Sequence, residues 1–180
     1  MTAEPLFCAF VKDRCVVTAP LRETLRVVKA HFDRDPGERV LVFEDRTGRQ
    51  VDFDLRGTAE EVLARVLPAR AGPGRPKLGV VSREISLMPR HWEWLEQQPN
   101  GISAAVRRLV EEARKRDPEE EEARLAREAT YRFMNAMAGD LPDFEEASRA
   151  LFGKDTARFV ALIGAWPADI RAQLLRMAPS

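Results

Sequence analysis

The sequence predicts an α+β protein built from four consecutive parts. We expect a small N-terminal module of two β-hairpins and two helices over residues 1–67, a basic linker over 68–81, a strand–helix–helix unit over 82–116 and a C-terminal helical bundle over 117–180. Short alternating apolar runs between turn signals fill the first third, whereas apolar residues at helical spacing fill the last third. The linker contains three prolines and three glycines. With 180 residues, 44% of them hydrophobic, the chain can form a core.

The first hairpin is expected over residues 6–12 and 15–19, where apolar and polar residues alternate. Pro20 then begins an amphipathic helix. If residues 13–14 form a two-residue turn, the two cysteines of the chain share one face of the hairpin but lie about 13 Å apart along it. That distance is too long for a disulfide, so we expect two reduced, structural thiols.

The second hairpin is expected over residues 39–43 and 50–55, with a turn in which Gly48 supplies a positive φ angle. Thr58 follows as the N-cap of a second helix. Glu61 lies three residues later, which is the spacing of a capping box. Two hairpins and two helices close only a marginal core over so short a segment, so we expect this module to pack against the rest of the chain.

The C-terminal bundle is predicted by a series of helix-start signals. Asp117 is a favourable N-cap, and Pro118 suits the first turn of the helix that follows. Four successive glutamates then complement the positive end of the helix dipole. Three further short amphipathic helices are expected to begin at Pro142, Lys154 and Pro167.

In the central unit, Ile85 and Leu87 alternate with polar residues, which predicts a strand over 82–88 with one polar face. Pro89 then opens one helix, and residues 101–103 open a second. This order resembles the ribbon–helix–helix unit of small dimeric DNA-binding proteins. In those proteins two strands, one from each subunit, pair and enter the major groove. By this resemblance, the side chains facing the bases would be Ser82, Glu84 and Ser86.

Further candidate contacts to DNA flank that strand. Ser103 is expected to cap the second helix, which would leave the backbone N–H groups of Ala104 and Ala105 free to bind a phosphate. The segment 74–77, Gly-Arg-Pro-Lys, resembles the centre of an AT-hook, although an ordinary linker is the alternative. The candidate nucleic-acid-binding residues are therefore Arg70, Arg75, Lys77, Ser82, Arg83, Glu84, Ser86, Ser103, Arg107 and Arg108.

Two interpretations of the central unit remain open. The first is a homodimer that binds double-stranded DNA. The second is a non-catalytic protein-interaction or scaffold protein, in which Trp92 and Trp94 lie in a core or in a groove for a partner. In the first interpretation the dimer core would contain Trp92, Leu95, Val106, Leu109 and Val110.

The distribution of charge along the chain is consistent with two interpretations, namely a surface that binds a polyanion and an ordinary solvated basic surface. The chain has no net charge, but residues 1–67 carry 11 basic and 12 acidic groups, residues 68–116 carry 10 and 5, and residues 117–180 carry 8 and 12. The positive charge is therefore concentrated in the middle of the chain. Such a local field attracts a polyanion even when the whole molecule is neutral.

Signatures of an enzyme are sparse, and we expect no catalytic activity, cofactor or metal. His31 and His91 are the only histidines and do not lie at metal-ligand spacing with the cysteines. Asp52 and Asp54 would share one strand face and could hold a cation, although a solvated face is the simpler interpretation. No apolar run is long enough to span a bilayer, and the N-terminus lacks a secretory pattern. We therefore expect a cytoplasmic protein without a membrane partner.

Five segments resemble a bacterial family catalogued as domain of unknown function 2239. They are Val42–Val51, Gly74–Val81, Leu87–Leu95, Phe133–Asp140 and Ala165–Asp169. These segments span nearly the whole chain, so the resemblance is specific. It implies no activity and transfers no functional residues.

Overall fold

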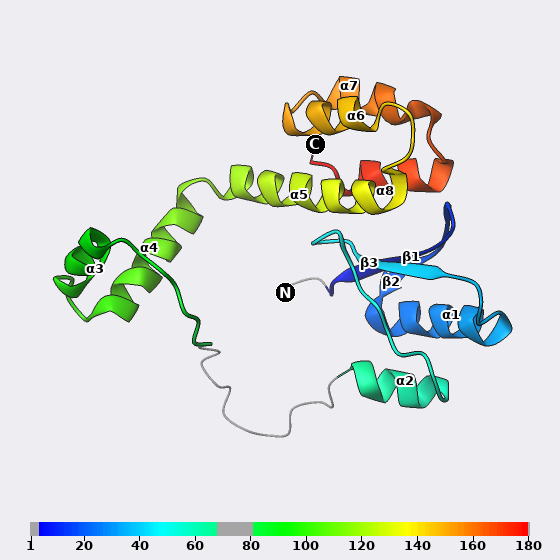
Figure 1. Ribbon diagram of the computed structural model, residues 1–180, viewed down its shortest axis with the longest axis horizontal. Helices are drawn as coiled ribbons and strands as arrows, with labels where there is room; N and C mark the ends of the chain where they lie inside the picture. The colour runs from blue at the N-terminus through cyan, green and yellow to red at the C-terminus, as the bar shows by residue number, and fades with distance from the viewer. Residues whose placement is uncertain (1–3, 68–80, 180) are drawn as a thin grey trace. The chain divides into compact units, whose positions relative to one another are not determined.

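A computed structural model describes residues 4–67 and 81–179 of the chain. Its residues group into two compact units. Unit 1 combines residues 1–69 with residues 123–180, and unit 2 consists of residues 70–122. The predicted α+β class is confirmed, because a four-stranded antiparallel sheet near the N-terminus is followed mainly by helices (Figure 1).

The sheet has the strand order β2-β1-β3-β4. Its strands are β1 (Leu6–Val11), β2 (Arg14–Pro20), β3 (Val40–Glu44) and β4 (Arg49–Gln50). The described helices are α1 (Leu21–Arg34), α2 (Ala59–Val66), α3 (Pro89–Glu96), α4 (Ile102–Arg116), α5 (Pro118–Ala138), α6 (Phe144–Phe152), α7 (Thr156–Leu162) and α8 (Ala168–Met177), with a 3-10 turn at Ile163–Ala165.

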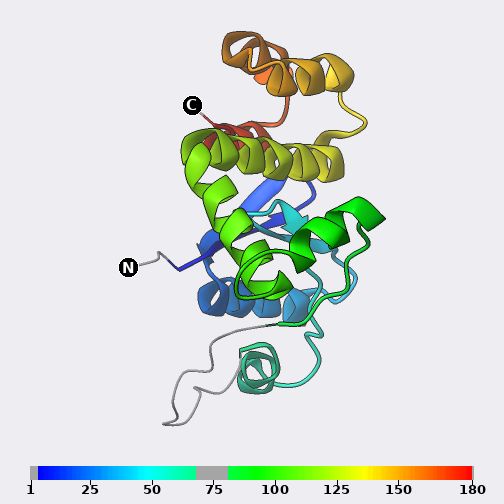
Figure 2. The ribbon, with the colours of Figure 1, turned by 90° about the vertical axis from the view of Figure 1, so that its left-hand side faces the viewer.

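Side chains on the two faces of the sheet enter two different cores, as the two-residue period of a strand requires. Phe7, Ala9 and Val42 pack with Val28 of α1. The intervening residues on the opposite face pack against α5 to α8. Figures 1 and 2 show α1 on one side of the sheet and α5 with α8 on the other. The sheet is thus the middle layer of unit 1.

An aromatic cluster joins the sheet to the C-terminal helices. Phe133 of α5 is fully buried, and its ring centroid lies 5.4 Å from that of Phe10 and 5.0 Å from that of Phe43. The ring planes of Phe133 and Phe43 meet at 79°, an edge-to-face geometry that aromatic pairs favour. The N-terminal module and the C-terminal helices therefore share one core.

Polar contacts reinforce this shared core at the ends of the strands. The backbone N–H of Cys15 donates to Asp169 of α8 at 2.9 Å. Asp45 accepts hydrogen bonds from Gln173 at 3.1 Å and from Arg176 at 2.9 Å. Gln173 is almost fully buried, so its pairing with a carboxylate avoids the cost of an unsatisfied buried amide.

The first hairpin differs from its prediction by one residue. Lys12 adopts a φ of 54° in the turn, and Val11 pairs with Arg14, so the turn residues are 12–13 and not 13–14. The register between β1 and β2 shifts between Ala9 and Phe10, because Ala9 pairs with Val17 and Phe10 with Cys15, which leaves Val16 of β2 as a bulge. The two cysteines are free. Burial and the neighbouring Asp45 carboxylate raise the pKa of the Cys8 thiol well above its ordinary range.

The predicted capping box of α2 is confirmed. The Thr58 hydroxyl accepts from the Glu61 backbone N–H, and the Glu61 carboxylate accepts from the Thr58 backbone N–H at 2.7 Å. The predicted strand over 50–55 is shorter than expected, because β4 ends at Gln50. The residues that follow instead contribute Val51, Phe53 and Leu55 to the core beneath α1.

Candidate interaction surface

Unit 2 is built from an irregular segment, residues 81–88, and the two helices α3 and α4. Pro89 is the first residue of α3, where its missing N–H costs no helical hydrogen bond. Gly101 precedes α4 with a φ of 80°, a conformation that residues with a Cβ rarely adopt. This glycine reverses the chain and brings α4 back beside α3.

Two details of the ribbon–helix–helix interpretation are wrong in this structure. Residues 82–88 form no strand, since no other segment among the described residues pairs with their backbone. The N-cap of α4 is Gly101 and not Ser103, because the backbone N–H groups of Ala104 and Ala105 both donate to the Gly101 carbonyl at 3.1 Å. These two N–H groups are therefore not free to clamp a phosphate.

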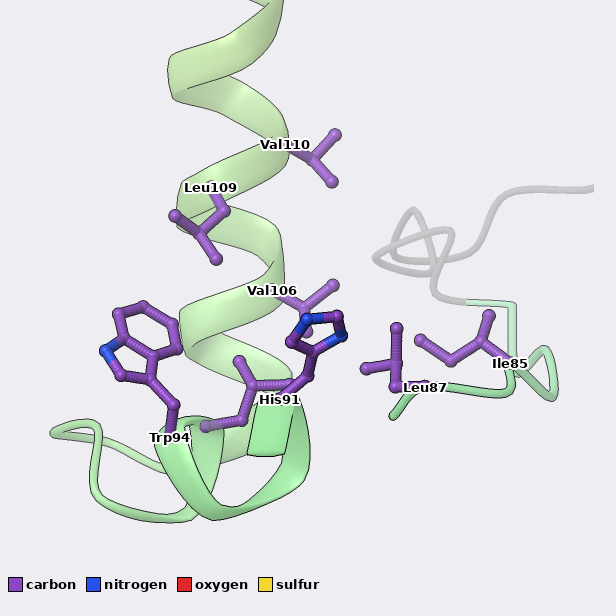
Figure 3. A pocket seen from close by; sticks show the side chains of 8 residues that line it. Ile85, Leu87, His91, Trp94, Val106, Leu109 and Val110 are labelled. Atoms are coloured by element: carbon purple, nitrogen blue, oxygen red, sulfur yellow. The ribbon is translucent and has the colours of Figure 1, made fainter. Parts of the chain in front are cut away.

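The main feature of unit 2 is an open cleft of about 330 Å³, which we call the apolar cleft. Figure 3 shows Trp94 on one side of it and Ile85 with Leu87 on the opposite side, with His91 and Val106 between them. Apart from the imidazole of His91 and the indole N–H of Trp94, the lining side chains are hydrocarbon. The complete lining is Ile85, Leu87, His91, Trp94, Leu95, Val106, Leu109 and Val110.

Unit 2 buries very little of its own apolar surface. Only Leu95 and Ala105 are buried among its described hydrophobic residues. Six of the eleven large hydrophobic residues that are exposed in the described chain belong to this unit. They are Val81, Ile85, Met88, Trp94, Leu109 and Val110. An apolar face of this kind, gathered around a cleft, is typical of a site for a binding partner.

Sequence reasoning identified much of the cleft. Leu95, Val106, Leu109 and Val110 were expected in an interface and do line the cleft, but Trp94 takes the place predicted for Trp92. The alternation of Ile85 with Leu87 also predicted correctly that both share one side, although without a strand. His91 was not expected there. Its spacing of three and four residues from Trp94 and Leu95 on α3 places it on the same helix face.

The predicted nucleic-acid-binding residues are only partly covered by the structure. Arg70, Arg75 and Lys77 lie outside the described residues. Ser82, Arg83, Glu84, Ser86, Ser103, Arg107 and Arg108 are all exposed and do not line the apolar cleft. Arg108 forms an ion pair with Glu112 at 3.2 Å and donates to Gln98 at 3.3 Å, so its charge is partly neutralised. The proposed contacts of all these residues with DNA stay predictions.

The resemblance noted in the sequence is confirmed over almost the entire chain. Residues 6–178 match the family described as "Uncharacterized protein conserved in bacteria (DUF2239)". The chain belongs to this family. No curated protein and no solved structure matches it. The description of the DUF2239 family names no reaction, ligand or partner.

Asp52 and Asp54 of this DUF2239 chain were considered in the sequence as a possible cation site. Asp54 accepts from Arg56 at 2.9 Å and also pairs with Arg65 at 3.4 Å. Hydrogen bonds from Arg56 hold the pKa of the Asp54 carboxyl well below its usual range. Asp52 accepts from Gln50 at 3.1 Å. The Asp54 charge is thus already paired within the chain.

Neither a metal-binding cluster nor a membrane-spanning helix occurs among the described residues. Over residues 4–67 and 81–179, no cluster of three or more His, Cys, Asp or Glu side chains is arranged to hold a metal ion. Among the helices of those same residues, none is both long enough and apolar enough to cross a membrane.

Proposed function

We propose that the protein is a non-catalytic interaction protein, which binds a protein partner through the apolar cleft of unit 2. The observation that supports this proposal is the open apolar face formed by α3, α4 and residues 81–88. Transfer of apolar surface out of water contributes roughly 25 cal/mol per Å². A partner that covers this face therefore gains affinity without any new polar chemistry.

The size of unit 2 supports the same proposal. A domain of about 60 residues is already marginal, because it buries a smaller share of its surface than a larger domain does, and unit 2 is shorter than that. The described part of unit 2 has no cysteine and buries only Leu95 and Ala105. Coverage of the cleft by a partner would supply the missing burial.

The lining of the cleft favours binding over catalysis. His91 is the only titratable residue that lines the cleft, and among the described residues its imidazole accepts a long hydrogen bond from Arg90 at 3.5 Å. Nucleophilic or acid–base catalysis requires a base, a nucleophile and an orienting group within hydrogen-bond reach of one another. A single imidazole on a hydrocarbon surface does not meet that requirement.

Site-specific photo-crosslinking in living bacteria tests the proposal. Benzoylphenylalanine replaces Trp94, and a matched variant carries it at Phe152, an aromatic residue of unit 1 with a similar exposed fraction, 49% against 47%. We expect an ultraviolet-dependent protein adduct from position 94 and little or none from position 152. No adduct at position 94, or equal adducts at both positions, would overturn the proposal.

DNA binding is the second candidate, and the basic excess over residues 68–116 favours it. Arg83 and Arg107 are exposed and form no ion pair with any described residue, so both are available to phosphates. Fluorescence anisotropy with labelled duplex DNA should then show affinity that falls steeply with salt. Replacing Arg75 and Lys77 with alanine should reduce the salt slope by about one for each lost phosphate contact. An unchanged slope would count against contacts between DNA and the basic linker, residues 68–81.

A further inference from the structure

We infer that the partner segment bound by the apolar cleft is an acidic amphipathic helix. This inference rests on the proposed interaction function and specifies the chemistry of the partner. Such a helix carries apolar side chains on one face and carboxylates along the edges of that face. The surface of unit 2 complements both parts, because its cleft is apolar and the unpaired charges beside the cleft on α3 and α4 are positive.

The first of these charges belongs to Arg90 of α3. Its guanidinium donates to the imidazole of His91, which lies in the cleft (Figure 3), at 3.5 Å. Arg90 also lies four residues before Trp94, a spacing that places the two side by side on the helix surface. It is exposed and forms no ion pair with any described residue. Its charge is therefore available to a carboxylate at this edge of the cleft.

The second charge belongs to Arg107 of α4, which lies three residues before one of the residues that line the cleft. It is exposed and has no ion-pair partner within residues 4–67 and 81–179. Two other charged residues of α4, Glu112 and Arg114, lie three or four residues from a lining residue. Glu112 is already paired with Arg108 at 3.2 Å. Arg114 is already paired with Glu111 at 3.1 Å, so Arg107 supplies the unpaired charge at this edge.

The carboxylates of α3 do not lie beside the cleft. Neither Glu93 nor Glu96 is three or four residues from a lining residue of this helix, so both face away from the cleft. In the segment before α3, Arg83 and Glu84 are both exposed and cancel in net charge. None of the described residues that line the cleft is a carboxylate. The two arginines beside the cleft therefore attract an acidic partner and repel a basic one.

The dimensions of the cleft suit a helix better than a folded domain. Trp94 is 47% exposed. Ile85, Leu109 and Val110 are exposed by 51%, 39% and 51%. These four side chains offer much less than the roughly 800 Å² per partner of a standard interface. An amphipathic helix fills a groove with about two or three apolar side chains spaced by three or four residues. Because its charge pairs would be exposed, the complex should weaken as salt rises.

Fluorescence anisotropy with designed peptides and the purified full-length protein provides the test. The probe is a labelled peptide with leucines at helical spacing and glutamates at the flanking positions. One control peptide has the same composition but carries its leucines at every second position, and another has lysines in place of the glutamates. We expect the probe to bind at least about tenfold more tightly than either control, with an affinity that falls as salt rises.

Two sets of protein variants locate the binding. Trp94→Ala removes one wall of the cleft and should weaken binding of the probe at least about tenfold. Arg90→Glu with Arg107→Glu should weaken it by about tenfold at low salt and by less at high salt. The matched control is Arg22→Glu with Arg26→Glu, since both arginines are exposed on α1 of unit 1 and neither forms an ion pair with a described residue. This control should leave the affinity unchanged.

Several results would overturn the inference. They are an absence of binding by the probe, equal binding of all three peptides, and equal effects of the two double variants. Binding of labelled duplex DNA without binding of the probe would assign the two arginines to a nucleic acid and would also overturn it. Photo-crosslinking from position 94 separates this failure from that of the proposed function. The adduct should be lost in the background Arg90→Glu with Arg107→Glu. An adduct that persists there leaves the proposed function standing without the inference, whereas no adduct in either background removes both.

Discussion

The two units of the molecule differ in how far they bury their apolar residues. Of the 25 hydrophobic residues that are buried in the described chain, 23 belong to unit 1 and two to unit 2. Trp166 in unit 1 is 4% exposed, and its indole N–H donates to the Pro142 carbonyl at 2.8 Å. Trp94 in unit 2 is 47% exposed and lines an open cleft. Unit 1 thus completes its own core, whereas unit 2 keeps its apolar surface available.

This difference separates stability from function in one chain. The core of unit 1 is formed by segments that lie far apart in the sequence, so it fixes the sheet and the C-terminal helices as one body. Under the proposed function, the exposed apolar surface of unit 2 would gain further stabilising contacts when a partner covers it. Substitutions in the two units should therefore affect different measurements, namely unfolding for unit 1 and association for unit 2.

The largest expected effect is the loss of stability of unit 1 in the variant Gly48→Ala. Gly48 has a φ of 64°, and a Cβ added there would lie 1.9 Å from the Ala129 carbonyl oxygen. Because backbone atoms would have to separate, Gly48→Ala should lower the free energy of unfolding of unit 1 by about 3–5 kcal/mol. Urea unfolding followed by Trp166 fluorescence measures this loss, in a background where Trp92 and Trp94 are phenylalanine.

The matched control for this prediction is Gly164→Ala. A Cβ at Gly164 meets no atom within 4 Å, so this variant should change stability by less than about 0.5 kcal/mol. If both glycine variants unfold at the same urea concentration, the close approach of the β3–β4 turn to α5 does not contribute measurably to the stability of unit 1.

The second prediction compares one substitution in both units. Leu174 is fully buried in unit 1, whereas Leu109 in unit 2 is 39% exposed. Leu174→Ala should cost about 2–5 kcal/mol, because it removes buried methyl groups and leaves a cavity. Leu109→Ala should cost less than about 1 kcal/mol in dilute protein, because much of its surface already contacts water.

Hydrogen exchange of amides in α8 and α4 measures the two losses separately. Equal costs for the two leucines would mean that unit 2 has a closed core of its own.

Much of unit 1 was predictable because its signals are local. Gly48 in a turn and Thr58 with Glu61 at a helix start each specify backbone geometry within a few residues. The alternation in β1 and β3 correctly indicated sheet strands. The turn of the first hairpin was displaced by one residue, because Lys12 adopts a positive φ that non-glycine residues seldom show.

The arrangement of unit 2 was less predictable, because a strand pattern specifies faces but not pairing. Ile85 and Leu87 share one side as expected, yet the segment lacks a neighbouring strand among the described residues. Gly101, not Ser103, caps α4, since a glycine at positive φ was needed to reverse the chain. The choice of Trp94 over Trp92 for the cleft depends on how α3 rotates against α4, which no local signal determines.

A smaller effect is expected from adding a cap to unit 2. Met88 is the N-cap of α3, has an extended backbone and makes no side-chain cap hydrogen bond. Met88→Asp provides an acceptor for the first-turn N–H groups and a negative charge at the positive end of the helix. It should stabilise α3 by about 1 kcal/mol relative to Met88→Ala, as measured by amide exchange. If the aspartate and alanine variants protect α3 equally, the missing cap is not a source of its instability.

The smallest predicted effect concerns the α2 helix of unit 1, which has the complete cap that α3 and α4 lack. The Thr58 backbone N–H donates to the Glu61 carboxylate and lowers the pKa of that carboxyl. A carboxyl with a lower pKa in the folded state stabilises the fold above its unfolded pKa of about 4.3. That contribution is lost as the pH falls through the folded pKa.

Amide exchange and chemical shifts of α2, followed as the pH is lowered from neutral to below the unfolded pKa of about 4.3, should show this loss. Glu61→Gln retains an acceptor but removes the charge, so it should flatten the pH dependence of α2. Glu60→Gln, one residue away and outside the capping box, should leave the dependence in place. If both glutamine variants flatten it equally, the effect comes from the general charge of the first turn. The capping box would then add nothing specific to the end of α2, and in this respect the helix ends of the two units would be alike.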